Sequence, residues 1–339
     1  MGNLNSEVKR IAWWFTWFFI LFVGCDSEPE GARKLFSVTD ARSDAMAIAF
    51  SPDNQTFAFI TQDNQVQLRD LSKNKVLQTL YYNNIDQAVN LSFSPDGSQL
   101  AVSTIRVVDV WDIENNQLQK SFLVDDLYPY GAKRMAFSHD GLLLALNAGD
   151  TLRIWDIRTG EIITDTELEH YRHYAGHIIF SPKDDLIALF TGYLHIWDLE
   201  SEALIASTPN GSDSFSFTAD GMELVSIKRN DVFRWRMPNG ELIDKFTIDN
   251  RLPLLAVLPP DAKEVIEFSY GRYNLENQDT QNETFEFNIS LWNVEDGELL
   301  WRMVTDDVEF SNLGYLVASP TGDHVAMIGL GIVDIWQIK

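Results

Sequence analysis

Seven four-residue turns of one type recur along the chain, and this repeat restricts the possible folds more than any other feature of the sequence. The clearest copy is Ser94-Pro95-Asp96-Gly97, and the other copies begin at Ser51, Ser138, Ser181, Thr218, Pro259 and Ser319. Pro sets φ for the first central position, Asp bonds the backbone two residues further on, and Gly accepts the positive φ that closes a hairpin. Apolar or alternating runs flank each turn, so we predict a pair of neighbouring strands at every copy.

A second landmark follows each turn at a similar spacing. It is Trp-Asp or a relic of that pair, at Arg69-Asp70, Trp111-Asp112, Trp155-Asp156, Trp197-Asp198, Trp235-Arg236, Trp292-Asn293 and Trp336-Gln337. With these residues in register with the seven turns, the chain resembles the WD-repeat β-propeller family from about Arg33 to its last residue. The resemblance implies that each Trp ends the third strand of a four-stranded antiparallel blade and packs between blades.

We therefore expect an all-β, seven-bladed β-propeller over residues 33–339. The sequence after Gln337 is too short to give blade seven an outer strand, and Lys34 to Val38 can supply that strand and close the ring. The landmarks are evenly spaced except between Arg236 and Asn293. The long step predicts an insertion at about residues 270–283, between the second and third strands of blade six.

The N-terminal segment predicts where the ring is held. An apolar run from Ile11 to Gly24 ends at Cys25, the single cysteine of the chain. A helix of that run reaches roughly 21 Å, short of the ~30 Å hydrocarbon core, so the run is typical of a signal-peptide h-region. The segment also resembles a bacterial lipoprotein signal, in which cleavage before Cys leaves a thiol that carries lipid. We expect a signal peptide over 1–24, lipidation at Cys25 and a tether over 25–32.

Two other interpretations of the N-terminal segment stay open. Met1 to Ser6 fits the loose N-myristoylation pattern, which leaves the apolar run before a lone cysteine unexplained. The run could also be an uncleaved anchor, with Cys25 only the boundary residue. The lipoprotein interpretation implies a bacterial cell envelope, with the chain held at a membrane and facing the periplasm or exterior.

Charge and motifs narrow the possible functions. A formal net charge of −24 argues against a nucleic-acid partner, because phosphate backbones attract cations. The sequence has no Gly-rich phosphate loop, zinc-protease motif or nucleophile elbow, so we assign no catalytic, cofactor or metal residues. His170, His173 and His177 could offer imidazole ligands to a metal. Their spacing suits one face of a helix, whereas they fall in a connection between strands, which favours a loop of exposed rings.

Three irregular segments are predicted to share one face of the propeller, and they are residues 124–130, 170–175 and 270–283. Loops from the outer strand of one blade to the inner strand of the next lie on the same face as the loops between second and third strands. Tyr and Arg are common anchors of protein interfaces. The predicted binding face therefore carries Tyr128, Tyr130, Tyr171, Arg172 and Tyr273.

The sequence thus predicts a non-catalytic scaffold that binds another protein or a peptide and is attached to a membrane through lipid on Cys25. One alternative is an envelope hydrolase of the lactonase-like propeller type with a metal in its central channel, although the inner strands contribute few convergent His or carboxylate side chains. Another is a cytosolic WD-repeat scaffold, which requires the N-terminal signal to be coincidental.

Overall fold

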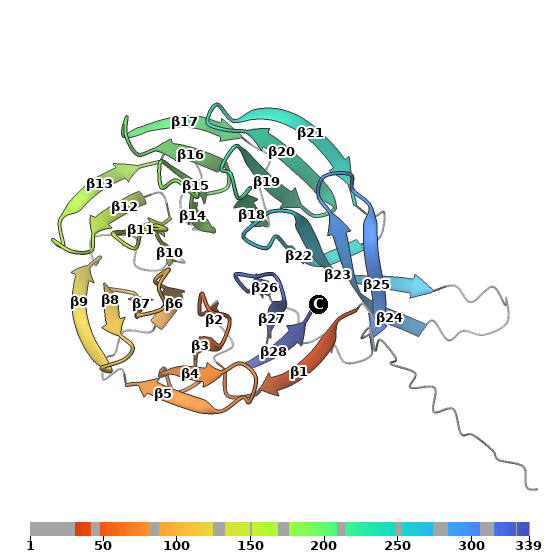
Figure 1. The fold of residues 1–339 in the computed structure, drawn as a ribbon, viewed down its shortest axis with the longest axis horizontal. Helices are drawn as coiled ribbons and strands as arrows, with labels where there is room; N and C mark the ends of the chain where they lie inside the picture. Colours follow the sequence, from red (N-terminus) through yellow and green to blue (C-terminus); the bar gives the residue numbers. More distant parts are fainter. Residues whose placement is uncertain are drawn as a thin grey trace, which may run out of the picture. The chain divides into compact units, whose positions relative to one another are not determined.

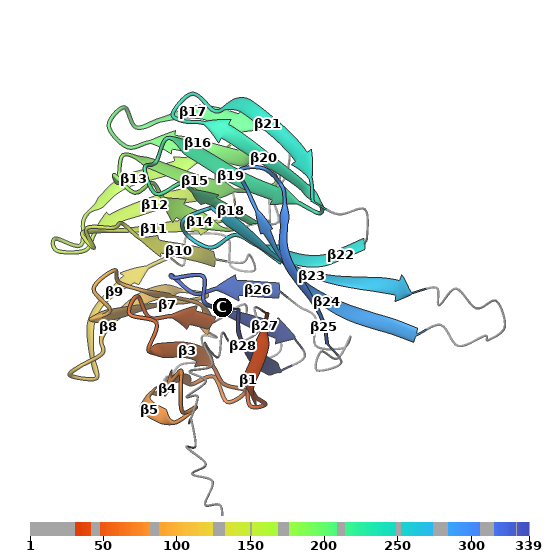
Figure 2. The same cartoon turned by 45° about the vertical axis from the view of Figure 1, so that its right-hand side comes forward.

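The protein is a ring of seven antiparallel sheets, each with four strands (Figures 1 and 2). The computed structural model describes residues 31–41, 48–81, 88–124, 133–149, 151–168, 176–208, 214–248, 252–273, 284–305, 315–329 and 331–338. The elements assigned within these ranges are all strands, and each sheet is one blade. The predicted all-β, seven-bladed propeller is confirmed.

The strands of each blade run in chain order from the centre of the ring to its rim. Blade one has β2 (Ile48–Phe50), β3 (Thr56–Ile60), β4 (Val66–Asp70) and β5 (Val76–Leu80). Blade two has β6 (Ala88–Phe93), β7 (Gln99–Thr104), β8 (Val107–Asp112) and β9 (Gln117–Leu123). Blade three has β10 (Lys133–Phe137), β11 (Leu143–Ala148), β12 (Thr151–Asp156) and β13 (Ile162–Glu167). Blade four has β14 (Ile178–Phe180), β15 (Leu186–Phe190), β16 (Leu194–Asp198) and β17 (Ala203–Thr208).

The remaining three blades repeat this pattern. Blade five has β18 (Ser214–Phe217), β19 (Glu223–Lys228), β20 (Asp231–Arg236) and β21 (Glu241–Thr247). Blade six has β22 (Leu252–Val257), β23 (Glu264–Tyr273), β24 (Thr284–Asn293) and β25 (Leu299–Thr305). Blade seven has β26 (Tyr315–Ala318), β27 (His324–Gly329) and β28 (Ile332–Gln337), and its outer strand is β1 (Arg33–Val38).

The N-terminal strand closes the ring as predicted. β1 pairs antiparallel with β28, from Arg33 opposite Gln337 to Val38 opposite Val333. The Lys34 ammonium lies 3.0 Å from Oδ1 of Asp334, a side chain that is 1% exposed. Because its first and last strands share a sheet, blade seven leaves no open end in the ring.

The apolar core is divided among the seven junctions between blades. Successive side chains of a strand point to opposite faces of its blade, and apolar side chains on each face pack against the blade on that side. Seven buried clusters result, and each contains residues of two consecutive blades, as in the cluster of Val225 and Ile227 with Val265 and Trp292. The fold is therefore held together by contacts between neighbours, as in other repeat proteins.

The landmark tryptophans are part of these junctions. Trp155, Trp197, Trp235, Trp292 and Trp336 are buried. The indole N–H of Trp235 donates to Ser226 Oγ at 2.9 Å, and that of Trp292 donates to the buried Glu267 carboxylate at 2.8 Å. The Trp residues act as packing groups, as the family resemblance implied.

The seven repeated turns lie on one face of the ring, which we call the tight-turn face. It carries the turns between first and second strands, at residues 51–55, 94–98, 138–142, 181–185, 218–222, 258–263 and 319–323, and the turns between third and fourth strands. The fourth residue of each repeated turn has positive φ, including Asn54, Asp184 and Ala262 in place of Gly. This confirms the predicted role of that position.

Neighbouring turns on the tight-turn face contact one another. A side-chain carbon at Gly97 would lie 3.6 Å from Cδ of Pro52 in the preceding turn. The Asp184 carboxylate accepts hydrogen bonds from the backbone N–H groups of His139 and Asp140, at 2.7 and 3.0 Å. Such contacts join consecutive turns on the tight-turn face.

Blade six departs from the repeat on the opposite face. β23 and β24 are the longest strands of the ring, and they extend as a hairpin beyond their neighbours (Figures 1 and 2). β22 pairs with β23 only as far as Tyr270, and β25 pairs with β24 only from Phe287. The insertion is therefore not irregular from residue 270, because strand pairing continues to Tyr273 opposite Thr284.

Candidate functional site

Most of the residues predicted to contact a partner lie outside the described part of the chain. Tyr128, Tyr130, Tyr171 and Arg172 are outside the described residues, as is Cys25. Tyr273 is described in its backbone, as the last residue of β23. Their contacts are therefore untested.

The face opposite the tight turns, which we call the variable-loop face, is where the fourth strand of each blade ends and the first strand of the next blade begins, and the connections between these strands differ most in length. These are residues 39–47, 81–87, 124–132, 168–177, 209–213, 248–251 and 306–314, together with the turns between second and third strands. Sequence reasoning missed two exposed side chains at its rim. Tyr81 directly follows β5 and is 71% exposed, and Leu123 ends β9 and is 69% exposed. Both lie where neighbouring outer strands reach this face.

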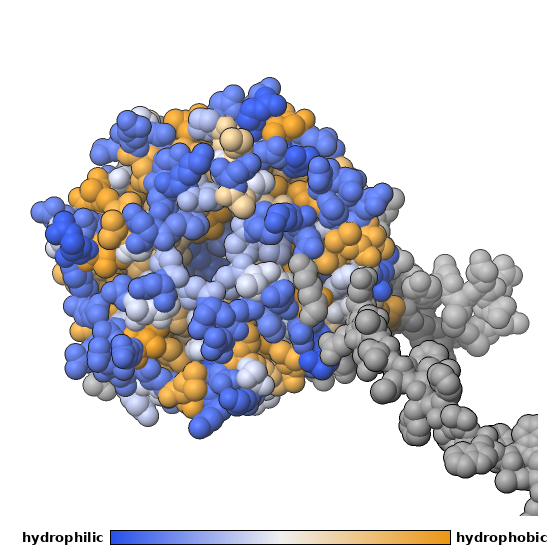
Figure 3. All heavy atoms as spheres, viewed as in Figure 1, coloured by the Kyte–Doolittle hydropathy of each residue, from blue (hydrophilic) through white to orange (hydrophobic). Residues whose placement is uncertain are grey.

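Three polar side chains lie near the starts of inner strands at the centre of the ring. Arg134 is on β10, His177 directly precedes β14, and Tyr315 begins β26. The His177 ring lies 5.2 Å, centroid to centroid, from Phe215. The enclosed position of the imidazole at the centre of the propeller, together with the nearby Arg134 guanidinium, lowers the pKa of His177. Burial raises the pKa of the Tyr315 hydroxyl, and the Arg134 guanidinium opposes that rise. Figure 3 shows the ring hollowed at its centre.

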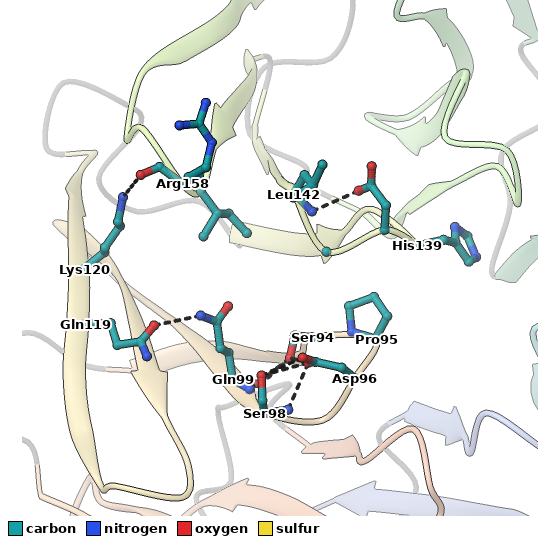
Figure 4. A pocket seen from close by; sticks show the side chains of 13 residues that line it. Ser94, Pro95, Asp96, Ser98, Gln99, Gln119, Lys120, His139, Leu142 and Arg158 are labelled. Atoms are coloured by element: carbon teal, nitrogen blue, oxygen red, sulfur yellow. Dashed lines mark hydrogen bonds between the residues drawn. The ribbon is translucent and has the colours of Figure 1, made fainter.

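A groove lies on the tight-turn face between blades two and three (Figure 4). Its volume is about 570 Å³, within the range of small-ligand sites. Ser94, Asp96, Ser98, Gln99 and Gln119 line it from blade two. Leu142, Ile157 and Arg158 line it from blade three, and Lys120 crosses between the blades by donating from Nζ to the Arg158 carbonyl oxygen at 2.8 Å.

The aspartates of the Trp-Asp landmark cap the turns between third and fourth strands. Asp112 accepts from the backbone N–H of Asn115 at 2.9 Å, and Asp156 accepts from that of Thr159 at 2.7 Å. These backbone hydrogen bonds hold the pKa of both carboxyls below its usual range. Asp198 is held in the same way, chiefly by the Ser201 hydroxyl. The landmark carboxylates are structural.

Acid is expected to weaken the ring through these caps. Because the folded-state pKa values are lower than the unfolded value of 3.8, the ionised carboxylates stabilise the fold above about pH 4, and the contribution is lost as the pH falls further. We expect the Tm to fall as the pH is lowered from about 4 to 2, and to fall less in an Asp112→Asn, Asp156→Asn double variant. Melting curves followed by circular dichroism test this, and an equal fall in the variant would contradict it.

Among the described residues, no three or more His, Cys, Asp and Glu side chains come together to hold a metal ion. His170 and His173, which could have joined His177 in such a site, lie outside those residues.

The comparisons with known proteins agree with the architecture. The family model described as the WD40 domain of anaphase-promoting complex subunit 4 matches residues 48–127, which include the strands of blades one and two. A comparison with curated proteins gave no match.

Proposed function

We propose that this chain, which is a WD-repeat β-propeller, is a non-catalytic scaffold that binds another protein or a peptide on its variable-loop face. The observation that carries the proposal is the contrast between the two faces. The tight-turn face repeats one turn seven times, whereas the variable-loop face gathers the unequal connections and the blade-six hairpin. Loops on a rigid scaffold are where recognition usually occurs.

The family match supports the same class of function. The matching model is described as a domain of a subunit of the anaphase-promoting complex, which is a domain within a multi-protein assembly. By that analogy, the ring presents a surface to other polypeptides.

We further propose that the scaffold is held at a bacterial membrane by lipid on Cys25. The support is the sequence of residues 11–25, with its apolar run and single cysteine. The described residues contain no helix long and apolar enough to cross a membrane. Residues 26–32 span at most about 25 Å when extended, so a lipid on Cys25 would keep the ring close to the bilayer.

Single substitutions on the variable-loop face are expected to weaken partner binding while sparing the fold. Tyr81→Ala, Tyr128→Ala and Arg172→Ala should each lower the affinity by roughly thirtyfold, the effect of losing an interface anchor of about 2 kcal/mol. Deletion of residues 275–282 should act in the same direction. Partners captured from detergent-solubilised membranes and identified by mass spectrometry give the readout.

Matched controls lie on the tight-turn face. Asn116 and Asn239 are in the turns after β8 and β20, and Asn116 has a positive φ that Gly tolerates. Asn116→Gly and Asn239→Ala should leave capture unchanged. If only these two variants lose the partner, the variable-loop face is not the binding surface.

A further inference from the structure

The groove between blades two and three holds two cationic side chains that the repeat does not require. Lys120 is on β9 and Arg158 is in the turn after β12. The hydrogen bond from Lys120 Nζ to the Arg158 backbone places the ammonium beside residue 158 (Figure 4). Both residues line the same cavity, and the Arg158 side chain is 78% exposed.

Strand register shows that Lys120 breaks the sevenfold pattern. It stands opposite Val110, the residue before the landmark Trp111. The equivalent residues in the other outer strands are Gln78, Thr164, Ala206, Asp244, Trp301 and Phe36. Lys120 is thus the single cation among seven equivalent positions.

Arg158 breaks the pattern in the same way. It lies two residues after the last residue of β12. In the other turns between third and fourth strands this position holds Ser72, Glu114, Glu200, Pro238 and Glu295. Two departures from the repeat, on neighbouring blades, therefore place positive charge in one groove of a chain whose net charge is −24. Six other blades lack a cation at the position of Lys120, and five other turns lack one at the position of Arg158. The packing of a blade therefore does not require either cation.

The carboxylates of the groove are already occupied, whereas the cations keep donors for a ligand. Asp96 accepts from the Ser94 hydroxyl at 2.6 Å and from the Ser98 backbone at 3.0 Å. Asp140 accepts from the Ser138 hydroxyl at 2.6 Å and from the Leu142 backbone at 2.9 Å. Lys120 has three N–H donors and only one bond to a carbonyl is formed, while Arg158 approaches the Asp156 carboxylate no closer than 4.0 Å.

The groove also offers apolar contact. Leu142 is 54% exposed beside it, and Ile157 lies beneath. A ligand of the groove therefore combines an anionic head with an aliphatic body. Because two carboxylates and two cations line the groove, its charge is near neutral, which suits a carboxylate with a charge of −1 better than a phosphate with a charge near −2.

We propose that this groove binds a carboxylate carried on an aliphatic body, with Lys120 and Arg158 as the cationic partners of the carboxylate. Two sources supply this chemistry, a small aliphatic acid and the C-terminal end of a peptide. The site lies on the tight-turn face and is independent of the partner surface on the variable-loop face.

Ligand-observed NMR and calorimetry on the full chain in detergent test the proposal. The probes are N-acetyl-leucine, an N-acetylated tetrapeptide of two alanines and two leucines with a free terminal carboxylate, the amides of both, and inorganic phosphate. We expect the two acids to bind and their amides to bind at least tenfold more weakly. Tighter binding of the tetrapeptide identifies a peptide end as the ligand, and tighter binding of N-acetyl-leucine identifies a small acid.

The repeat supplies substitutions that other blades already tolerate. Lys120→Thr copies blade three, and Arg158→Glu copies blade two. The double variant should keep its Tm and lose acid binding by about tenfold, because both cationic partners of the carboxylate are removed and exposed ion pairs are individually weak. Lys73→Thr, at an exposed lysine of blade one, should bind the acids like the unaltered protein. The proposal is overturned if neither acid binds, if the amides or phosphate bind as tightly, or if the double variant binds unchanged.

Discussion

Deletion of residues 33–38 is expected to lower the free energy of unfolding by several kcal/mol. The deletion removes β1, exposes the edge of β28 and uncovers the cluster in which Val38 packs with Phe57 and Ile335. It also leaves the Asp334 carboxylate buried without the Lys34 ammonium, and uncompensated buried charge alone costs about 3–5 kcal/mol.

Thermal melting measures this loss. For a chain of this size, we expect the Tm to fall by roughly 10 °C or more. Deletion of residues 27–30, which precede the strand, is the control and should leave the Tm unchanged. Lys34→Met should lose much of the same stability, whereas Lys34→Met combined with Asp334→Leu should recover part of it, because replacing both charges removes the unpaired ion. An unchanged Tm after deletion of β1 would contradict closure of the ring by this strand.

Cys25→Ser is expected to abolish both acylation and processing, so the variant keeps residues 1–24 and carries no lipid. Cys25 is the single cysteine of the chain, so no second thiol can receive the lipid. The acyl chains, which contribute about 0.8 kcal/mol per buried CH₂ to membrane binding, are therefore absent from the variant.

Intact-mass measurement of the mature chain, together with fractionation, tests the anchor. The unaltered protein should begin at Cys25 and carry the mass of a diacylglycerol and an acyl group. Ser27→Ala, close to the site but without a thiol to lose, should be processed normally. A mature terminus at another residue, or an unmodified Cys25 in the membrane fraction, would contradict the lipid anchor.

The fold could be predicted because its signal is repeated. One Ser-Pro-Asp-Gly turn is weak evidence, but seven in register with the Trp landmarks leave a single closed arrangement. The predicted outer strand from Lys34 to Val38 was correct because blade seven otherwise lacks a rim strand. The insertion was interpreted as irregular from residue 270, whereas strand pairing continues to Tyr273 opposite Thr284. Apolar residues alternate through Phe285, Phe287 and Ile289, which is the pattern of a continuing strand. The interpretation used only the long spacing between the landmarks at Arg236 and Asn293 and overlooked this alternation.

The candidate sites were harder to predict because they break the repeat. The predicted anchors other than Tyr273 lie outside the described residues, so that surface stays a prediction. Lys120 and Arg158 are far apart in sequence, and neither belongs to a motif. A comparison of equivalent positions across blades could have found each cation. Only the packing of blade two against blade three shows that they share a groove.

The seam between β1 and β28 also sets the order in which the chain can finish folding. Arg33 donates to the Gln337 side chain across 304 positions of sequence. At a synthesis rate of about 5–20 residues per second, β1 waits roughly 15–60 s for its partner strand to be made. Six blades can assemble from neighbouring segments during that time, and blade seven is completed last. In that interval β1 is an unpaired strand open to mispairing, and the charges of Arg33 and Lys34 at its start disfavour association with the wrong edge.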